Sequence, residues 1–206
     1  MSFAICAIHR NDVFIAADSQ ITANKAQITM HGFNKIFKIN DSTAIALCGN
    51  VSFTELVKKA LSIRLSKTTD EIDAPLAEQI ILLDLATADQ NWTRFNKVNA
   101  PEAVILIAGF DGPNPYISAI ALYNHKIDVI HNRADIGEYE FIPAIPPDLE
   151  PFDCIELCQK HLLHAELRSR HPKEALESLV VEISKSSSTV DDRTEILTLR
   201  PKDQMR

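Results

Sequence analysis

The sequence predicts an α+β fold in which two antiparallel sheets are stacked and a pair of helices covers the outer face of each sheet, giving four αββα layers. Three observations favour this fold. Apolar runs occur in pairs around short polar turns, which is typical of hairpins. Long segments with helical periodicity also occur in two pairs. The 206 residues, 46% of them hydrophobic, suffice for one domain over 1–206 with a polar tail at about 201–206.

The N-terminal quarter of the chain is expected to form two hairpins. Its four strands are predicted at residues 2–8, 13–17, 35–39 and 43–48. The second strand stops at Asp18, and the last pair surrounds Asn40-Asp41, a dipeptide that favours turns. Residues 19–34 are mixed and polar, so no element is predicted there.

Two helix pairs and further strands are expected in the rest of the chain. The predicted helices are residues 51–66, 75–96, 151–168 and 172–186, and the predicted strands are 103–110, 116–123, 126–131 and 193–199. Pro75 suits the first turn of its helix, with Asp73 as the N-cap. The proline-rich stretch 143–151 is expected to be a connection. Periodicity alone favours a plain α+β domain almost equally.

The composition disfavours several classes of protein. The net charge is −7, and no dense Lys/Arg cluster is present, so binding to nucleic acid is not expected. No apolar run is long enough to span a membrane, and the apolar stretch at the start is too short for a signal peptide. We therefore expect a cytoplasmic protein without a membrane segment. Cys6 and Cys48 lie inside apolar runs, as buried free thiols do.

The second pair of cysteines allows two interpretations. Cys154, Cys158 and His161 share one face of a predicted helix, and thiolate and imidazole are zinc ligands. Small cysteines also pack helices against sheets, and no further ligands are evident nearby. We favour packing, and we predict no metal and no cofactor.

One lysine of the third predicted strand must lie on a packed face. Side chains alternate across a strand, so Lys35 shares a face with Phe37, whereas Lys38 shares the other face with Ile36. A lysine among apolar groups needs a counter-charge. Asp18, at the tip of an adjacent strand, is the obvious one. Taken singly, however, Asp18 could merely end a strand and Lys35 could be solvated.

Four segments, in order, resemble the β-type subunits of proteasomes and their bacterial homologues. They are Phe14-Ile15-Ala16-Ala17-Asp18-Ser19, Asn34-Lys35-Ile36-Phe37-Lys38-Ile39, Ala44-Ile45-Ala46-Leu47-Cys48-Gly49, and Ile107-Ala108-Gly109-Phe110-Asp111-Gly112 with Pro115-Tyr116. The resemblance covers roughly residues 2–131. Ser2 precedes Asp18 by 16 positions, as the nucleophile of that family precedes its aspartate.

The resemblance implies an N-terminal-nucleophile (Ntn) hydrolase of the threonine/serine peptidase type. After removal of Met1, the hydroxyl of Ser2 would be the nucleophile, and its own α-amino group would be the base. Lys35 would lower the pKa of that hydroxyl, and Asp18 would orient Lys35.

The same resemblance implies the rest of the site. The backbone N–H of Gly49 would stabilise the oxyanion. Leu47 and Val51 flank that turn and would line the specificity pocket, although they could equally be ordinary core residues.

The sequence also departs from the family pattern. The nucleophile is serine where threonine is usual, and residues 139–144 lack the Gly/Ser-rich segment that precedes the third helix in proteasomes. Ser187 aligns with an aspartate that the family carries before the last strand. The usual support for the α-amino group is therefore missing from the sequence.

The helix expected at 75–96 predicts self-association. Its residues Ile80, Ile81, Leu82, Leu83 and Leu85 point in almost every direction around the axis. One face should meet another subunit, and we expect Leu82 or Leu85 there. The resemblance implies a homo-oligomeric ring that encloses the active sites.

Three functions are compatible with these observations. The favoured one is hydrolysis of peptide bonds in peptides or unfolded proteins inside the ring. The alternatives are a non-catalytic proteasome-related subunit for assembly or peptide binding, and an Ntn hydrolase acting on a small amide. The sequence does not identify any ATPase partner.

Overall fold

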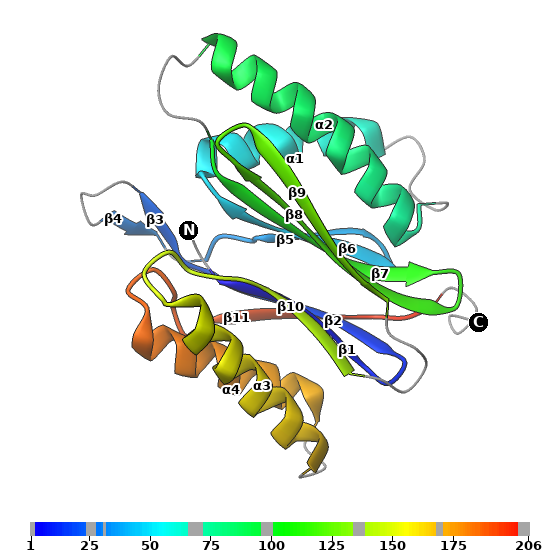
Figure 1. Cartoon of the computed structure of the whole chain (residues 1–206), viewed down its shortest axis with the longest axis vertical. Coiled ribbons are helices and arrows are strands. Elements are labelled where there is room, and N and C mark those ends of the chain that lie inside the picture. The colour runs from blue at the N-terminus through cyan, green and yellow to red at the C-terminus, as the bar shows by residue number, and fades with distance from the viewer. Residues whose placement is uncertain are drawn as a thin grey trace.

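The computed structural model describes residues 3–23, 28–30, 32–65, 72–95, 101–133, 139–167 and 171–201. Two antiparallel sheets lie face to face, and a helix pair covers the outer face of each (Figure 1). The helices are α1 (Val51–Leu65), α2 (Ala74–Phe95), α3 (Pro151–Leu167) and α4 (Pro172–Ser186). The predicted four-layer αββα sandwich is therefore confirmed.

The four-stranded sheet has the order β10-β1-β2-β11. Its strands are β1 (Ala4–His9), β2 (Asp12–Asp18), β10 (Tyr139–Ala144) and β11 (Thr194–Leu199). All three pairings are antiparallel, and β1 and β2 form the expected hairpin. Strands from both ends of the sequence thus meet in one sheet, and the starts of β1 and β11 lie at the same end of β2.

The five-stranded sheet follows the chain in the order β5-β6-β7-β8-β9. Its strands are β5 (Ile36–Asn40), β6 (Thr43–Gly49), β7 (Ala103–Asp111), β8 (Asn114–Tyr123) and β9 (Lys126–Arg133). The helices α1 and α2 lie between β6 and β7 in the sequence and cover this sheet. A separate two-stranded ribbon consists of β3 (Ile21–Ala23) and β4 (Ile28–Met30).

The alternation of side chains along each strand divides the apolar residues among three clusters. Cys6 and Cys48 are buried between the two sheets, as expected. Ile5 of β1 points the other way, into the cluster under α3 and α4. Cys154 and Cys158 belong to that outer cluster, which agrees with the packing interpretation.

Three strands were not predicted from the sequence. Strand β10 lies where no element was predicted and overlaps the first two residues of the expected connection, because Pro143 argues against a strand. Proline is tolerated here because β10 is an edge strand that pairs only with β1. The short strands β3 and β4 lie in the polar segment 19–34, where the apolar pattern is too brief to predict an element.

The α2 helix begins as predicted but faces the core differently. The backbone N–H of Leu76 donates to Asp73 Oδ1 at 2.9 Å, so Asp73 is the N-cap. Leu85 is fully buried against the five-stranded sheet, so the expectation of an intersubunit contact at Leu85 is wrong. Leu82 is only partly buried, and Leu83, with 63% of its surface accessible, is the most exposed of the leucines whose side chains the structure describes.

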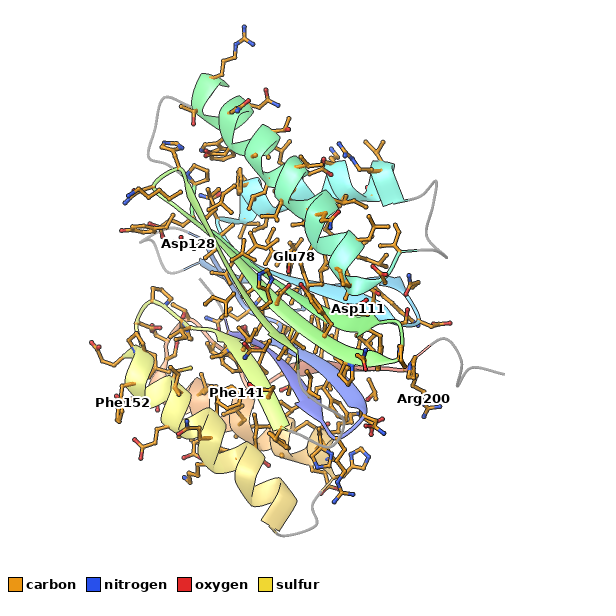
Figure 2. All side chains as sticks on the ribbon, turned by 45° about the vertical axis from the view of Figure 1, so that its right-hand side comes forward. Glu78, Asp111, Asp128, Phe141, Phe152 and Arg200 are labelled. Atoms are coloured by element: carbon orange, nitrogen blue, oxygen red, sulfur yellow. The ribbon has the colours of Figure 1, made fainter. Side chains whose placement is uncertain are left out.

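Polar contacts fasten α2 to the hairpin of β8 and β9. Figure 2 shows Glu78 between α2 and the five-stranded sheet, where Tyr116 Oη donates to Glu78 Oε2 at 2.7 Å. His131 Nδ1 lies 3.2 Å from the same carboxylate. His125 pairs in the same way with Asp89. His125 and His131 therefore tie a helix to a hairpin.

Candidate active site

A buried ion pair joins the ends of two strands from different sheets. Lys35 Nζ lies 2.7 Å from Asp18 Oδ1, and the two side chains are 3% and 0% exposed. Lys35 immediately precedes β5, and Asp18 is the last residue of β2. Lys38 instead points to solvent and pairs with Asp41. Lys35 is therefore the lysine on the packed face, and Asp18 is its counter-charge, as the sequence predicts.

The Asp18 carboxylate also binds the backbone next to residue 2. Its Oδ1 accepts from the N–H of Phe3 at 2.9 Å, and its Oδ2 accepts from the N–H of Gln20 at 3.0 Å. Burial raises the pKa of Asp18, whereas Lys35 and these two N–H donors oppose the rise. Three donors on two oxygens favour the carboxylate form. Ser2 itself lies outside the described residues.

Gly49 ends β6 in a conformation that excludes other residues. Its φ is +129°, and an added Cβ would stand 2.3 Å from the carbonyl oxygen of Glu102. The N–H of Asn50 donates to that same oxygen, and Asn50 Oδ1 caps the start of α1 by accepting from the N–H of Phe53. Only glycine allows the chain to turn so tightly here.

The two residues expected to line a specificity pocket differ in their surroundings. Leu47 is buried in the apolar cluster under α1 and α2, which agrees with the core alternative. Val51, the first residue of α1, is half-buried. Cys48 follows Leu47 in the sequence. Burial raises the pKa of its thiol to about 12. This cysteine therefore stays a thiol at neutral pH and does not compete as a nucleophile.

A cluster around Asp148 was not predicted from the sequence. Its carboxylate accepts hydrogen bonds from Ser187 Oγ at 2.7 Å, from Ser188 N at 2.8 Å and Oγ at 2.9 Å, and from Thr189 Oγ1 at 3.0 Å. Burial acts against the charge, but these hydrogen bonds lower the pKa of Asp148 to about 2. Asp148 lies in the loop before α3, and Ser187, which the sequence analysis aligns with an aspartate of the family, donates to it.

The segment held by Asp148 also reaches the end of β2. Gln20 Nε2 donates to the carbonyl oxygen of Ser188 at 3.0 Å. The N–H and Oγ of Ser19 donate to Asp191 at 3.0 and 2.9 Å. Residues 187–191 therefore adjoin the two residues that follow Asp18. No spacing in the sequence signals this contact, because more than 160 positions separate the partners.

The sequence also matches a known protein family. Residues 2–127 match the proteasome subunit family. The chain belongs to this family. Comparison with curated proteins gives no match.

Solved structures share the fold of this proteasome subunit family member at low sequence identity. HslV from Trypanosoma brucei matches with a TM-score of 0.62 and 9% identity, covering 97% of this chain and 99% of that chain. The Anbu complex from Pseudomonas aeruginosa, described as a helical assembly, matches with a TM-score of 0.71 and 14% identity, covering 97% and 81%. Anbu from Yersinia bercovieri matches with a TM-score of 0.65 and 12% identity, covering 96% and 81%.

Membership of the family and the likeness to HslV indicate a protein of the Ntn-hydrolase kind. No helix within the described parts of the chain is long and apolar enough to cross a membrane.

Proposed function

We propose that this chain is a proteasome-like Ntn peptidase whose nucleophile is Ser2, exposed by removal of Met1. The buried Lys35–Asp18 pair carries this proposal, because Asp18 binds the N–H of Phe3. Ser2 is bonded to Phe3, so its Cα lies about 3.8 Å from that of Phe3. A fixed cation is thereby kept close to residue 2, where a hydroxyl must lose its proton to attack.

Each residue has a defined role in the proposed reaction. The Ser2 oxygen attacks the peptide carbonyl while its proton passes to the α-amino group, which later protonates the leaving amine. Lys35 stabilises the developing negative charge on the hydroxyl oxygen, and Asp18 fixes Lys35. The backbone N–H of Gly49 stabilises the tetrahedral oxyanion. Water then hydrolyses the ester and regenerates the free hydroxyl.

The cluster around Asp148 supports the same site from the other side. The proteasome pattern places an aspartate where this chain has Ser187, and here the bound carboxylate is Asp148. Its contacts hold Ser188, which accepts from Gln20, and the N–H of Gln20 in turn binds Asp18. We propose that Asp148, in the loop before α3, supplies the negative charge that the aspartate supplies in the family pattern.

The proposed setting of this peptidase is a self-assembled particle in the cytoplasm that admits peptides or unfolded protein. The Anbu protein of Pseudomonas aeruginosa forms a helical assembly, which supports self-association for a chain of the same fold. The exposed Leu83 on α2 supports it as well.

The test is a reaction with a peptide epoxyketone, which forms its adduct with a hydroxyl and a free α-amino group of the same residue. Intact-mass spectrometry should show loss of Met1 and one inhibitor per chain. Ser2→Ala is the matched control, because alanine also permits removal of Met1 but lacks the hydroxyl. An unreacted wild-type chain with a free Ser2 would refute the proposal.

A non-catalytic role in assembly or peptide binding is the second candidate. It is favoured by the serine at position 187 in place of the family aspartate. Retention of Met1 on the purified chain would support this candidate, because a blocked Ser2 has no free α-amino group. Hydrolysis of small amides but not of peptides would instead indicate a small-amide hydrolase.

A further inference from the structure

Ser19 follows Asp18 directly and joins two segments of the candidate site. Its carbonyl oxygen accepts from the N–H of Phe33 at 3.1 Å, and its Oγ accepts from the N–H of Gly32 at 3.3 Å. Lys35 is two residues beyond Phe33, and its Nζ reaches back to Asp18. The two charges of the buried pair therefore lie on two segments that Ser19 holds together.

The carboxylate of Asp191 binds Ser19 in turn. Asp191 lies between α4 and β11 and is 9% exposed. Its Oδ1 accepts from the N–H of Ser19 at 3.0 Å, and its Oδ2 accepts from Ser19 Oγ at 2.9 Å. Hydrogen bonds to a charged acceptor are roughly twice as strong as those between neutral groups. Asp191 is therefore a strong anchor for the residue next to the ion pair.

These two bonds are additional to the pairing of the strands. Strand β11 pairs with β2 as far as Thr194 and Asp18, and the N–H of Ser19 extends this ladder by donating to the carbonyl oxygen of Arg193 at 3.2 Å. The ladder thus holds the backbone of Ser19 to β11 without any help from a side chain. What depends on Asp191 is the hydroxyl of Ser19.

The hydroxyl proton of Ser19 determines what its oxygen can accept. A serine hydroxyl has one proton and two lone pairs. Because the proton is donated to Asp191 Oδ2, a lone pair of Oγ remains for the N–H of Gly32. Without a partner at position 191 the hydroxyl is free to rotate, and the contact with Gly32 weakens. The segment that carries Lys35 then keeps its contact at Phe33 but loses the second one.

We infer that Asp191 is a positioning residue of the candidate active site, which acts through Ser19 to hold the segment carrying Lys35 where Lys35 binds Asp18. It acts on the geometry of the ion pair rather than on the reacting atoms. Its effect on a reaction at Ser2 rests on the proposed function, whereas its effect on the ion pair does not.

The ion pair supplies a test that needs no enzyme activity. Lys35→Met, Asp18→Asn and the double variant are made in the wild-type chain and again in an Asp191→Ala chain. In each chain, the coupling is the difference between the loss of stability in the double variant and the sum of the two single losses. Urea unfolding should give a coupling in Asp191→Ala that is roughly half of the wild-type value or less. A residue that adds stability elsewhere would leave the coupling unchanged.

The rate of adduct formation with the peptide epoxyketone is the second readout. Asp191→Ala should lower the maximal rate roughly tenfold or more, because small misplacements of catalytic groups have effects of this size. The inhibitor concentration that gives half of this rate should not change, since the proposed pocket at Leu47 and Val51 is unaltered. Asp191→Asn should restore both the rate and the coupling, because its amide accepts from the N–H of Ser19, donates to Oγ and leaves a lone pair for Gly32.

Two further variants complete the test. Asp192→Ala removes the same charge from the neighbouring, exposed residue and should leave the coupling and the rate unchanged. Ser19→Ala removes the same hydroxyl contact and should reproduce Asp191→Ala, so it replaces that variant if Asp191→Ala fails to fold.

The inference is overturned if the coupling keeps its wild-type value in Asp191→Ala, or in Ser19→Ala where that variant replaces it. It is also overturned if Asp191→Asn is as impaired as Asp191→Ala, because charge rather than position would then matter, or if Asp192→Ala is equally impaired. A wild-type chain that forms no adduct refutes the proposed function, and the coupling alone then decides the role of Asp191.

Discussion

Removal of both partners of the Lys35–Asp18 pair should cost much less stability than the sum of the two single removals. In Lys35→Met, Asp18 keeps its two backbone N–H donors but loses the only side-chain cation bonded to it in the described structure. Breaking a buried pair typically costs 3–5 kcal/mol, and the two remaining donors favour the lower end, about 3 kcal/mol. Asp18→Asn should cost a similar amount, because it leaves Lys35 buried without a counter-charge.

The double variant Lys35→Met with Asp18→Asn removes both charges. Its loss should be smaller than the sum of the two single losses by about 2–3 kcal/mol. Urea unfolding followed by circular dichroism at one fixed protein concentration measures all four free energies of unfolding. Lys38→Met is the control, because Lys38 forms an exposed pair and its loss should cost under about 1 kcal/mol.

The difference between the loss in the double variant and the sum of the two single losses shows whether Lys35 and Asp18 stabilise each other. Losses that add to within about 0.5 kcal/mol would refute the reasoning, because two groups that add in this way do not interact. A loss in Lys38→Met as large as that in Lys35→Met would refute it as well, since burial could then not be the cause.

Three further predictions concern other parts of the molecule. Asp148→Asn should lower stability at neutral pH by about 1 kcal/mol, after allowance for its exposure, and urea unfolding at several pH values should show a weaker acid dependence. The lowered pKa of Asp148, about 2, gives a stabilisation that is complete above the unfolded value and is lost as the pH falls towards 2. Gly49→Ala should cost about 2–3 kcal/mol in urea unfolding, because of its positive φ and the Glu102 oxygen. Leu83→Glu should leave the circular dichroism spectrum unchanged and reduce the mass of any assembly in light scattering, whereas Leu85→Glu should unfold the chain.

Each of these predictions has a contrary result. If the free energy of unfolding falls at acid pH as much in Asp148→Asn as in the wild type, the hydrogen bonds to Asp148 do not stabilise its charge. A Gly49→Ala variant as stable as the wild type would show that the turn relaxes freely. A wild-type chain that scatters light as a monomer would remove the assembly role of α2.

Much of the fold could be predicted because it depends on local patterns. Alternation and helical periodicity in single segments located the β1–β2 and β5–β6 hairpins and all four helices within a few residues. Strand β10 escaped prediction because its proline is acceptable only at a sheet edge, and the edge position is a property of the whole sheet. Leu85 was misassigned for a related reason, since periodicity does not say which side of an all-round apolar helix meets the sheet.

The candidate site also has one part that local patterns predict and another part that depends on the whole fold. The burial of Lys35 followed from the phase of one short strand, and Asp18 from its place at the tip of a neighbour. The contact of Asp148 with residues 187–189 joins a loop to the end of α4, about 40 positions away. Such contacts depend on how α3 and α4 return to the sheet, and no short motif encodes that path.

The three consecutive residues at the end of β2 each bind a different region of the chain. Asp18 contacts Phe3 and Lys35, Ser19 contacts Asp191, and Gln20 contacts Ser188. These partners span the sequence almost from end to end, so a ribosome must synthesise residue 191 before all of the contacts can exist. A nascent chain therefore carries an unfinished site, and any hydrolysis that depends on it has to wait until translation is nearly complete.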